Sequence, residues 1–254
     1  MAEHPQCCLN TPAVKSDYQP QGKHGIEIAG FPCYVVGDEG AKHVLILAYD
    51  IFGYWPTTML GCDMLASKLD ARVIVPDLLR GHYWDLRQGE PTAETRSRMG
   101  HILTSHGEPH ARAKDLVAFV KEIASSDAVE SIGLYGLCLG HKIISLAATD
   151  PALVRDYKVR GIATAHPARL DPQESKAISC PFFFAPTKDE AKEECEAYFA
   201  EIKSNRSIAE KSIYKRYEAY HGFAGARAKL DDPTYRADFE DFYQRATDFF
   251  KSVF

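Results

Sequence analysis

The sequence predicts an α/β protein with a mostly parallel central sheet and helices on both of its faces. Short apolar runs typical of buried strands alternate along the chain with segments in which apolar residues recur at helical spacing. Strands that alternate with helices pair in parallel, and the helices then cover both faces of the sheet. The length of 254 residues suits one such unit with a sizeable core. We therefore expect a single domain over 1–254 that begins with a polar segment over 1–24.

The first half of the chain carries the opening strands of this sheet. Gly30 and Pro32 interrupt the first apolar run, which is therefore expected as a strand or hairpin. Later in this half, apolar side chains recur at helical spacing in the segments that follow each short apolar run. The elements expected here are strands over 26–36, 43–49 and 72–76 and helices over 57–69, near 92–103 and over 111–124.

The second half continues the alternation and ends in a long amphipathic helix. Asp232 and Pro233 are typical of a helix start, and an apolar stripe of six residues follows at helical spacing, which we interpret as core. The elements expected here are strands from 131, over 161–165, from 181 and over 212–220, and helices through 143–147, over 190–204 and from 233.

The most informative segment is Gly136-Leu-Cys138-Leu-Gly140, which lies between a buried strand and a helix. A strand, a sharp turn and a helix form the context of a nucleophile elbow, in which the central residue is strained and the flanking glycines permit close approach. Cys138 would then project above the sheet at a helix N-terminus, where the dipole favours a thiolate. The alternative is a small buried cysteine that only packs.

Two further residues match the needs of such a nucleophile. Asp189 follows the apolar run from Pro181, and His221 follows the alternating run that ends at Tyr220. The order Cys138, Asp189, His221 is the order of nucleophile, acid and base in this kind of site. Each residue also lies beyond the carboxyl end of an expected strand, the edge where open α/β sheets place their sites.

With these residues, the chain resembles the dienelactone hydrolases (carboxymethylenebutenolidases), a cysteine branch of the α/β-hydrolase superfamily, and most closely their fungal members. The resemblance runs from about Gly25 to the C-terminus and rests on four separated motifs: Asp50-Ile-Phe-Gly53, Val75-Pro-Asp-Leu78, Gly136-Leu-Cys-Leu-Gly140 and His221-Gly-Phe-Ala224. It implies an α/β-hydrolase fold that opens an enol-lactone or related activated ester through a thioester.

The same resemblance implies a role for each matched residue. Cys138 would be the nucleophile, His221 the base and Asp189 the acid that orients the base. The backbone N–H groups of Ile51 and Leu139 would form the oxyanion hole. No metal and no cofactor are implied.

The chain departs from the family's bacterial pattern at the residues around the nucleophile. Asp50 stands where the bacterial members have a glutamate that holds the resting thiol, so we expect Asp50 to gate Cys138 or to anchor an arginine. Two arginines hold the bacterial substrate carboxylate, and Arg80 and Arg227 lie near those places but out of register.

A long polar segment between the strand ending at Pro76 and the helix from Ala111 adds further candidates. Loops of this length are commonly functional, and Arg80, Tyr83 and Trp84 could line a pocket for a ring-bearing anionic substrate. The alternative is a surface excursion in which Trp84 packs on the rim. His166 also follows an expected strand, and we interpret it as a structural loop residue rather than a second base.

Composition argues against two classes of protein, those that bind nucleic acid and those that span a membrane. The net charge of −5 offers no general attraction to nucleic acid, and no apolar run reaches the roughly 20 residues of a membrane span. Seven cysteines and the absence of a secretory pattern favour reduced thiols in the cytoplasm. Cys7 and Cys8 lack the spacing of a metal site. The expected partner is a small lactone or ester, and the oligomeric state is left open.

Two other functions share part of this sequence pattern. A class I amidotransferase also uses Gly-x-Cys-x-Gly but places His-x-Glu downstream, whereas His221 is followed by Gly222 and Phe223. The remaining alternative is a non-catalytic or weakly active α/β-hydrolase-fold protein with a binding or stress-response role.

Overall fold

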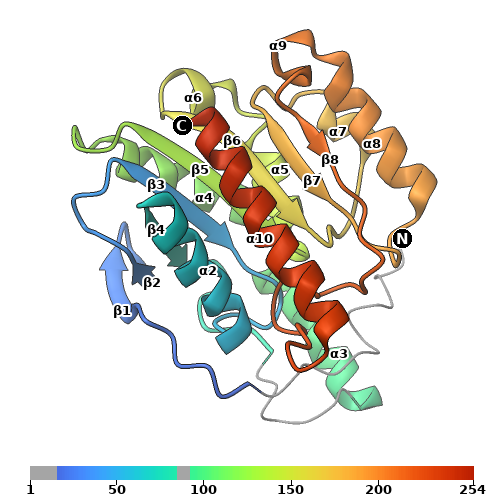
Figure 1. Ribbon diagram of the computed structural model, residues 1–254. Helices are drawn as coiled ribbons and strands as arrows, with labels where there is room; N and C mark the ends of the chain where they lie inside the picture. Colours follow the sequence, from blue (N-terminus) through green and yellow to red (C-terminus); the bar gives the residue numbers. More distant parts are fainter. Residues whose placement is uncertain (1–15, 85–91) are drawn as a thin grey trace.

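The computed structural model describes residues 16–84 and 92–254, and a sheet of eight strands forms the centre of that part (Figure 1). The strand order is β1-β2-β4-β3-β5-β6-β7-β8. Strands β3 to β8 pair in parallel with one another, and β2 pairs antiparallel with both β1 and β4. The strands are β1 (Lys23–Ile28), β2 (Phe31–Val36), β3 (His43–Ala48), β4 (Arg72–Pro76), β5 (Ser131–Leu137), β6 (Val159–Ala165), β7 (Phe182–Ala185) and β8 (Ile213–Tyr214).

Helices connect the parallel strands and cover the sheet on both faces, as the alternating pattern predicts. The helices are α2 (Pro56–Leu69), α3 (Ala93–His101), α4 (Pro109–Ala124), α5 (Leu139–Ala147), α6 (Pro151–Arg155), α7 (Pro172–Ser175), α8 (Lys192–Ser204), α9 (Arg206–Ala209) and α10 (Pro233–Val253), with a π-helical turn at Ile102–His106. Figure 1 shows α2 and α10 on one face of the sheet, with α4 and α5 on the other.

The last helix supplies a large part of the core, as its apolar stripe predicts. Six apolar residues of α10 are buried, and Phe242 stacks on Phe183 of β7 with ring centroids 5.6 Å apart. The stripe consists of Phe239, Phe242, Tyr243, Ala246, Phe249 and Phe250. Gly61 of α2 permits the close approach of the two helices, because a β-carbon there would overlap the Tyr243 hydroxyl.

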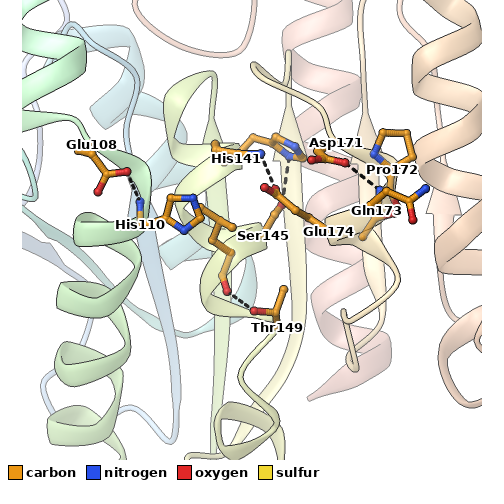
Figure 2. A network of polar contacts seen from close by, with 12 residues as sticks. Glu108, His110, His141, Ser145, Thr149, Asp171, Pro172, Gln173 and Glu174 are labelled. Carbon is orange, nitrogen blue, oxygen red and sulfur yellow. Dashed lines mark hydrogen bonds and ion pairs between the residues drawn. The ribbon is translucent and has the colours of Figure 1, made fainter. Parts of the chain in front are cut away.

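Acidic caps followed by proline define several helix starts. Glu108 accepts hydrogen bonds from the backbone N–H groups of His110 and Ala111, and Asp171 accepts one from Gln173 (Figure 2). Proline follows each of these caps, and its fixed φ suits the first helical position, where no N–H partner is needed. Each cap satisfies N–H groups that would otherwise lack a partner.

The structure corrects the expected elements in three places. The strand expected over 212–220 is paired only at β8, with an isolated bridge from Thr187 to Tyr217. This strand lies at the sheet edge, where one neighbour rather than two holds it. The short helices α6, α7 and α9 were not expected, and the helix expected near 92–103 continues through the π-helical turn.

The hairpin expected over 26–36 is confirmed as β1 and β2, and the strand over 72–76 as β4. The described cysteines are all buried, and none of them forms a disulfide with another: Cys33, Cys62, Cys138, Cys180 and Cys195. Cys7 and Cys8 and most of the 1–24 segment lie outside the described residues. Across 16–84 and 92–254, no helix combines the length and the apolar character of a membrane span.

Candidate active site

Cys138 lies at a strained turn between β5 and α5. Its backbone has φ 54° and ψ −112°, a conformation that non-glycine residues rarely adopt, and its side chain is buried. A β-carbon at Gly136 would lie 2.5 Å from the Gly140 backbone, and one at Gly140 would overlap the Ala48 carbonyl oxygen. Only glycine fits at both places, so the turn has the tight geometry that the sequence pattern predicts.

The close packing of Gly140 on β3 brings the segment after β3 next to Cys138. Asp50 is the second residue of that segment, and its carboxylate accepts hydrogen bonds from the Phe52 N–H at 2.8 Å and the Ala226 N–H at 3.4 Å. Burial raises the pKa of Asp50, although these two N–H donors and the charges of Arg227 and His221 act in the opposite direction. Asp50 thus connects residues 51–53, the candidate oxyanion segment that carries the Ile51 N–H, to the loop that carries His221.

The peptide that follows Asp50 is held in place by the segment after β4. The Trp84 N–H donates to the Ile51 carbonyl oxygen at 2.7 Å, and the Trp84 side chain is buried. The Tyr83 ring packs against Gly53, where a β-carbon would lie 2.5 Å from the ring. Tyr83 and Trp84 therefore lie next to the candidate oxyanion segment and shape it.

The His221 ring is held by Glu190. Its Nδ1 atom lies 2.7 Å from Glu190 Oε1, and both side chains are almost fully buried, with 3% and 9% of their surface exposed. The second oxygen of Glu190 accepts hydrogen bonds from the N–H and the hydroxyl of Thr187. Three contacts thus fix the carboxylate against the imidazole.

Asp189 is expected to orient the base, and the carboxylate that contacts the imidazole in the structure is that of Glu190, one residue later. Asp189 Oδ2 accepts a hydrogen bond at 2.7 Å from the backbone N–H of His221, so it fixes the main chain of the histidine and leaves the ring to Glu190. The physical reason is the turn after β7, which pairs with the segment before His221 through the Lys188 N–H and the Ala219 carbonyl. Asp189 and Glu190 are adjacent in the sequence, and the sequence pattern does not indicate which of the two carboxylates contacts the imidazole.

The two expected substrate arginines lie in different surroundings. Arg227 is buried beside the candidate site, with its guanidinium carbon 5.0 Å from the centre of the Phe52 ring. Arg80 extends away from the end of β4, over the Phe31 ring at 4.8 Å and toward Asp115 of α4 at 3.6 Å. The structure therefore associates Arg227 with Asp50 and His221, and it associates Arg80 with β2 and α4.

His166 occupies the end of β6 and belongs to the same group of residues. Its ring lies edge-on to the His221 ring with centroids 5.0 Å apart, and it is fully buried. Two nearby residues hydrogen-bond to the nucleophile turn: the Ala165 carbonyl accepts from the Cys138 N–H, and the Ala168 N–H donates to the Cys138 carbonyl. The sequence predicts a structural loop residue at this position, and the structure places the His166 ring against that of His221.

The described residues include no group of three or more His, Cys, Asp or Glu side chains arranged to hold a metal ion. The candidate site therefore consists of a strained cysteine, a histidine–glutamate pair and the segment after β3. All of these follow the carboxyl ends of strands in a mostly parallel sheet whose second strand is antiparallel. This fold and site define a protein of the α/β-hydrolase fold with a cysteine at the elbow.

The chain belongs to the dienelactone hydrolase family, whose model matches residues 31–254. It is 29% identical over 241 residues to an uncharacterized AIM2 family protein of Schizosaccharomyces pombe, covering 94% of each chain. Members of the family are hydrolases, and the expected resemblance is thereby confirmed.

Solved structures with low identity establish the fold. A dienelactone hydrolase-like promiscuous phosphotriesterase from metagenomic libraries has a TM-score of 0.65 at 14% identity, covering 92% of this chain and 98% of that chain. A dienelactone hydrolase from Anabaena variabilis has a TM-score of 0.56 at 14% identity, with the same coverage of both chains. The expected α/β-hydrolase fold is confirmed.

Proposed function

We propose that this protein is a cysteine-dependent hydrolase that opens an enol-lactone or a related activated ester through a thioester intermediate. The observation that carries the proposal is the combination of a strained Cys138 turn with a His221–Glu190 pair at the same edge of the sheet. Strained backbone conformations persist only where the surrounding structure enforces them, and they cluster at active sites. A carboxylate on Nδ1 is the partner that orients a catalytic histidine. Cys138 is the nucleophile, His221 the base and Glu190 the acid that orients the base.

Acylation begins with proton transfer from the Cys138 thiol to Nε2 of His221. The sulfur attacks the carbonyl carbon, forming a C–S bond and moving the π electrons onto oxygen. The backbone N–H groups of Ile51 and Leu139 stabilise that oxyanion, donors of a kind worth about 3–4 kcal/mol each. Glu190 stabilises the imidazolium through Nδ1.

Collapse of this intermediate breaks the C–O bond to the leaving group. The imidazolium of His221 protonates the leaving oxygen, which in a lactone opens the ring. His221 then removes a proton from water, hydroxide adds to the thioester carbon, and the Cys138 sulfur leaves and takes the proton back. Each proton that His221 accepts is returned, so the cycle balances with one water consumed per ester.

The substrate class follows from the nucleophile and from its charged neighbours. A thiolate is itself a good leaving group, so cysteine suits activated esters better than amides, and an enol-lactone is activated because its leaving group is an enolate. The buried guanidinium of Arg227 lies beside Phe52 and in the field of Asp50. We assign Arg227 to a carboxylate of the substrate and Asp50 to control of both Arg227 and the resting Cys138.

Thioester formation gives a direct test of this proposal. The protein should hydrolyse phenyl acetate and a dienelactone, and acid-quenched samples should carry one acyl group on Cys138 that hydroxylamine removes. Cys138→Ala should lose activity by at least about 10³-fold, because residues that act as a unit fail together. Cys180→Ala, which removes another buried thiol, should retain activity.

Two results would contradict the proposal. Near-normal hydrolysis by Cys138→Ala would remove the cysteine from the mechanism. Absence of hydrolysis by the wild-type protein, with a dienelactone bound but unchanged, would favour a binding role for the same fold.

A further inference from the structure

His166 is a buried polar residue for which the mechanism above has no use. Neither ring nitrogen has a hydrogen-bond partner within 16–84 and 92–254, and both are shielded from solvent. Its backbone has φ 39°, in the region that non-glycine residues avoid. A buried polar group without a partner and a strained backbone are both unfavourable, and such features recur at functional sites.

The strand order places His166 on one particular side of Cys138. β5, which leads into Cys138, lies between β3 and β6. The segment after β3 supplies the Ile51 amide on one flank, and the segment after β6 supplies His166 on the other. The hydrogen bond from the Cys138 N–H to Ala165 at 3.4 Å keeps this second flank against the nucleophile turn.

On that flank the His166 ring faces the base. The ring centroids of His166 and His221 are 5.0 Å apart at an interplanar angle of 65°. The Phe223 ring also packs edge-on against His166, with centroids 5.9 Å apart. Burial lowers the pKa of His166 well below its usual value, and the neighbouring His221 and Arg227 lower it further. A neutral imidazole has one N–H donor and one acceptor nitrogen, so His166 can donate a hydrogen bond without carrying charge.

We propose that His166 is a catalytic residue whose ring N–H binds the leaving oxygen of the ester or lactone. The oxyanion binds on the flank of Ile51, so the leaving oxygen lies on the opposite flank and under His221, which must protonate it. His166 transfers no proton: it stabilises the charge on the leaving oxygen while the C–O bond breaks and the proton arrives from His221. This inference rests on the proposed hydrolase function and extends it.

A second buried histidine has different surroundings and provides a control. His141 of α5 lies near the Ser145 hydroxyl, with Nδ1 to Oγ 3.4 Å (Figure 2), and its ring packs against Phe184 and Tyr198. Burial lowers its pKa to about 3. These contacts make His141 a core residue, whereas the ring of His166 lies against the candidate base.

A matched pair of substrates tests the role of His166. Phenyl acetate and S-phenyl thioacetate deliver the same acetyl group to Cys138, but sulfur is a weak hydrogen-bond acceptor. His166→Phe should lower kcat/KM for phenyl acetate by about 10- to 100-fold, the effect of losing one hydrogen bond made in the transition state. The loss for the thioester should stay below about threefold. His166→Asn, which keeps a donor, should restore part of the ester activity.

The ratio of the two kcat/KM values does not depend on the fraction of folded enzyme, so it distinguishes a role at the leaving atom from a structural one. His141→Phe should leave the ratio unchanged, and His166→Ala provides the same measurement if His166→Phe does not fold. Equal losses on both substrates, or no loss, would overturn the role of His166 while leaving the hydrolase intact. A wild-type protein inactive on both substrates would overturn the proposed function and this inference with it.

Discussion

Replacing Glu190 with glutamine should disable the base by fixing the wrong tautomer of His221. Glu190 now accepts a hydrogen bond from Nδ1 through one oxygen and two from Thr187 through the other. In Glu190→Gln, the backbone N–H of Thr187 requires the amide oxygen on its side. The amide NH₂ then faces Nδ1 and donates to it, so the imidazole proton moves to Nε2. A histidine protonated at Nε2 has no free acceptor for the Cys138 proton.

The size of the effect follows from these contacts. A buried hydrogen bond to a charged group contributes about 1.5–3 kcal/mol, and restoring the working tautomer would leave a buried donor facing another donor, at a cost of about 1–3 kcal/mol. Together these give about 2.5–6 kcal/mol, or a loss of roughly 10²- to 10⁴-fold in kcat/KM. A wrong tautomer in a serine protease triad lowers kcat by a similar factor of about 10⁴.

Asp189→Asn is the matched control. Its side chain accepts a hydrogen bond from the His221 backbone N–H, and an asparagine oxygen can still accept that bond. The change removes only the charge assistance, which we expect to lower kcat/KM by less than about tenfold.

The assay is hydrolysis of phenyl acetate by both variants, with thermal unfolding to verify that each is folded. Near-wild-type activity in Glu190→Gln together with a large loss in Asp189→Asn would refute this assignment and return the acid role to Asp189.

Three further predictions follow from burial and close packing. Burial raises the pKa of Asp50 above its ordinary value of 3.8, so its contribution to stability falls as the pH rises from that ordinary value through the higher pKa of the folded state. Asp50→Asn should therefore have a higher Tm than wild type at pH 7, by a margin that shrinks as the pH is lowered toward 3.8. A margin that does not change with pH would contradict this. Gly140→Ala should lower the free energy of unfolding in urea by about 1–3 kcal/mol or more, because its β-carbon overlaps the Ala48 carbonyl oxygen, whereas Gly100→Ala, which meets open space, should not destabilise the protein. Iodoacetamide at pH 7 should modify Cys138 before the other described cysteines. Burial raises the pKa of each of the others to about 12, namely Cys33, Cys62, Cys180 and Cys195. Peptide mapping that finds any of these four modified first would exclude an activated nucleophile at Cys138.

The sequence by itself determined the architecture and the position of the elbow. Hydrophobic periodicity predicts β4 and the apolar face of α10, because burial selects apolar residues at the period of each element. The glycines around Cys138 predict the tight turn, because only residues without a β-carbon permit the close backbone approach that such a turn requires. These features depend on residues that are neighbours in the chain.

The tertiary structure alone decided which side chains meet. Asp189 and Glu190 are adjacent in sequence, and only the pairing of the turn after β7 with the segment before His221 assigns one to the backbone and the other to the ring. Arg80 and Arg227 follow equally plausible motifs, yet packing directs Arg80 to α4 and buries Arg227 near Asp50. His166 follows β6 and His221 follows β8, two strands further along the sheet, so their contact joins residues far apart in the chain and leaves no local sequence pattern. Contacts of this kind are set by strand order and loop geometry, which depend on the packing of the whole sheet.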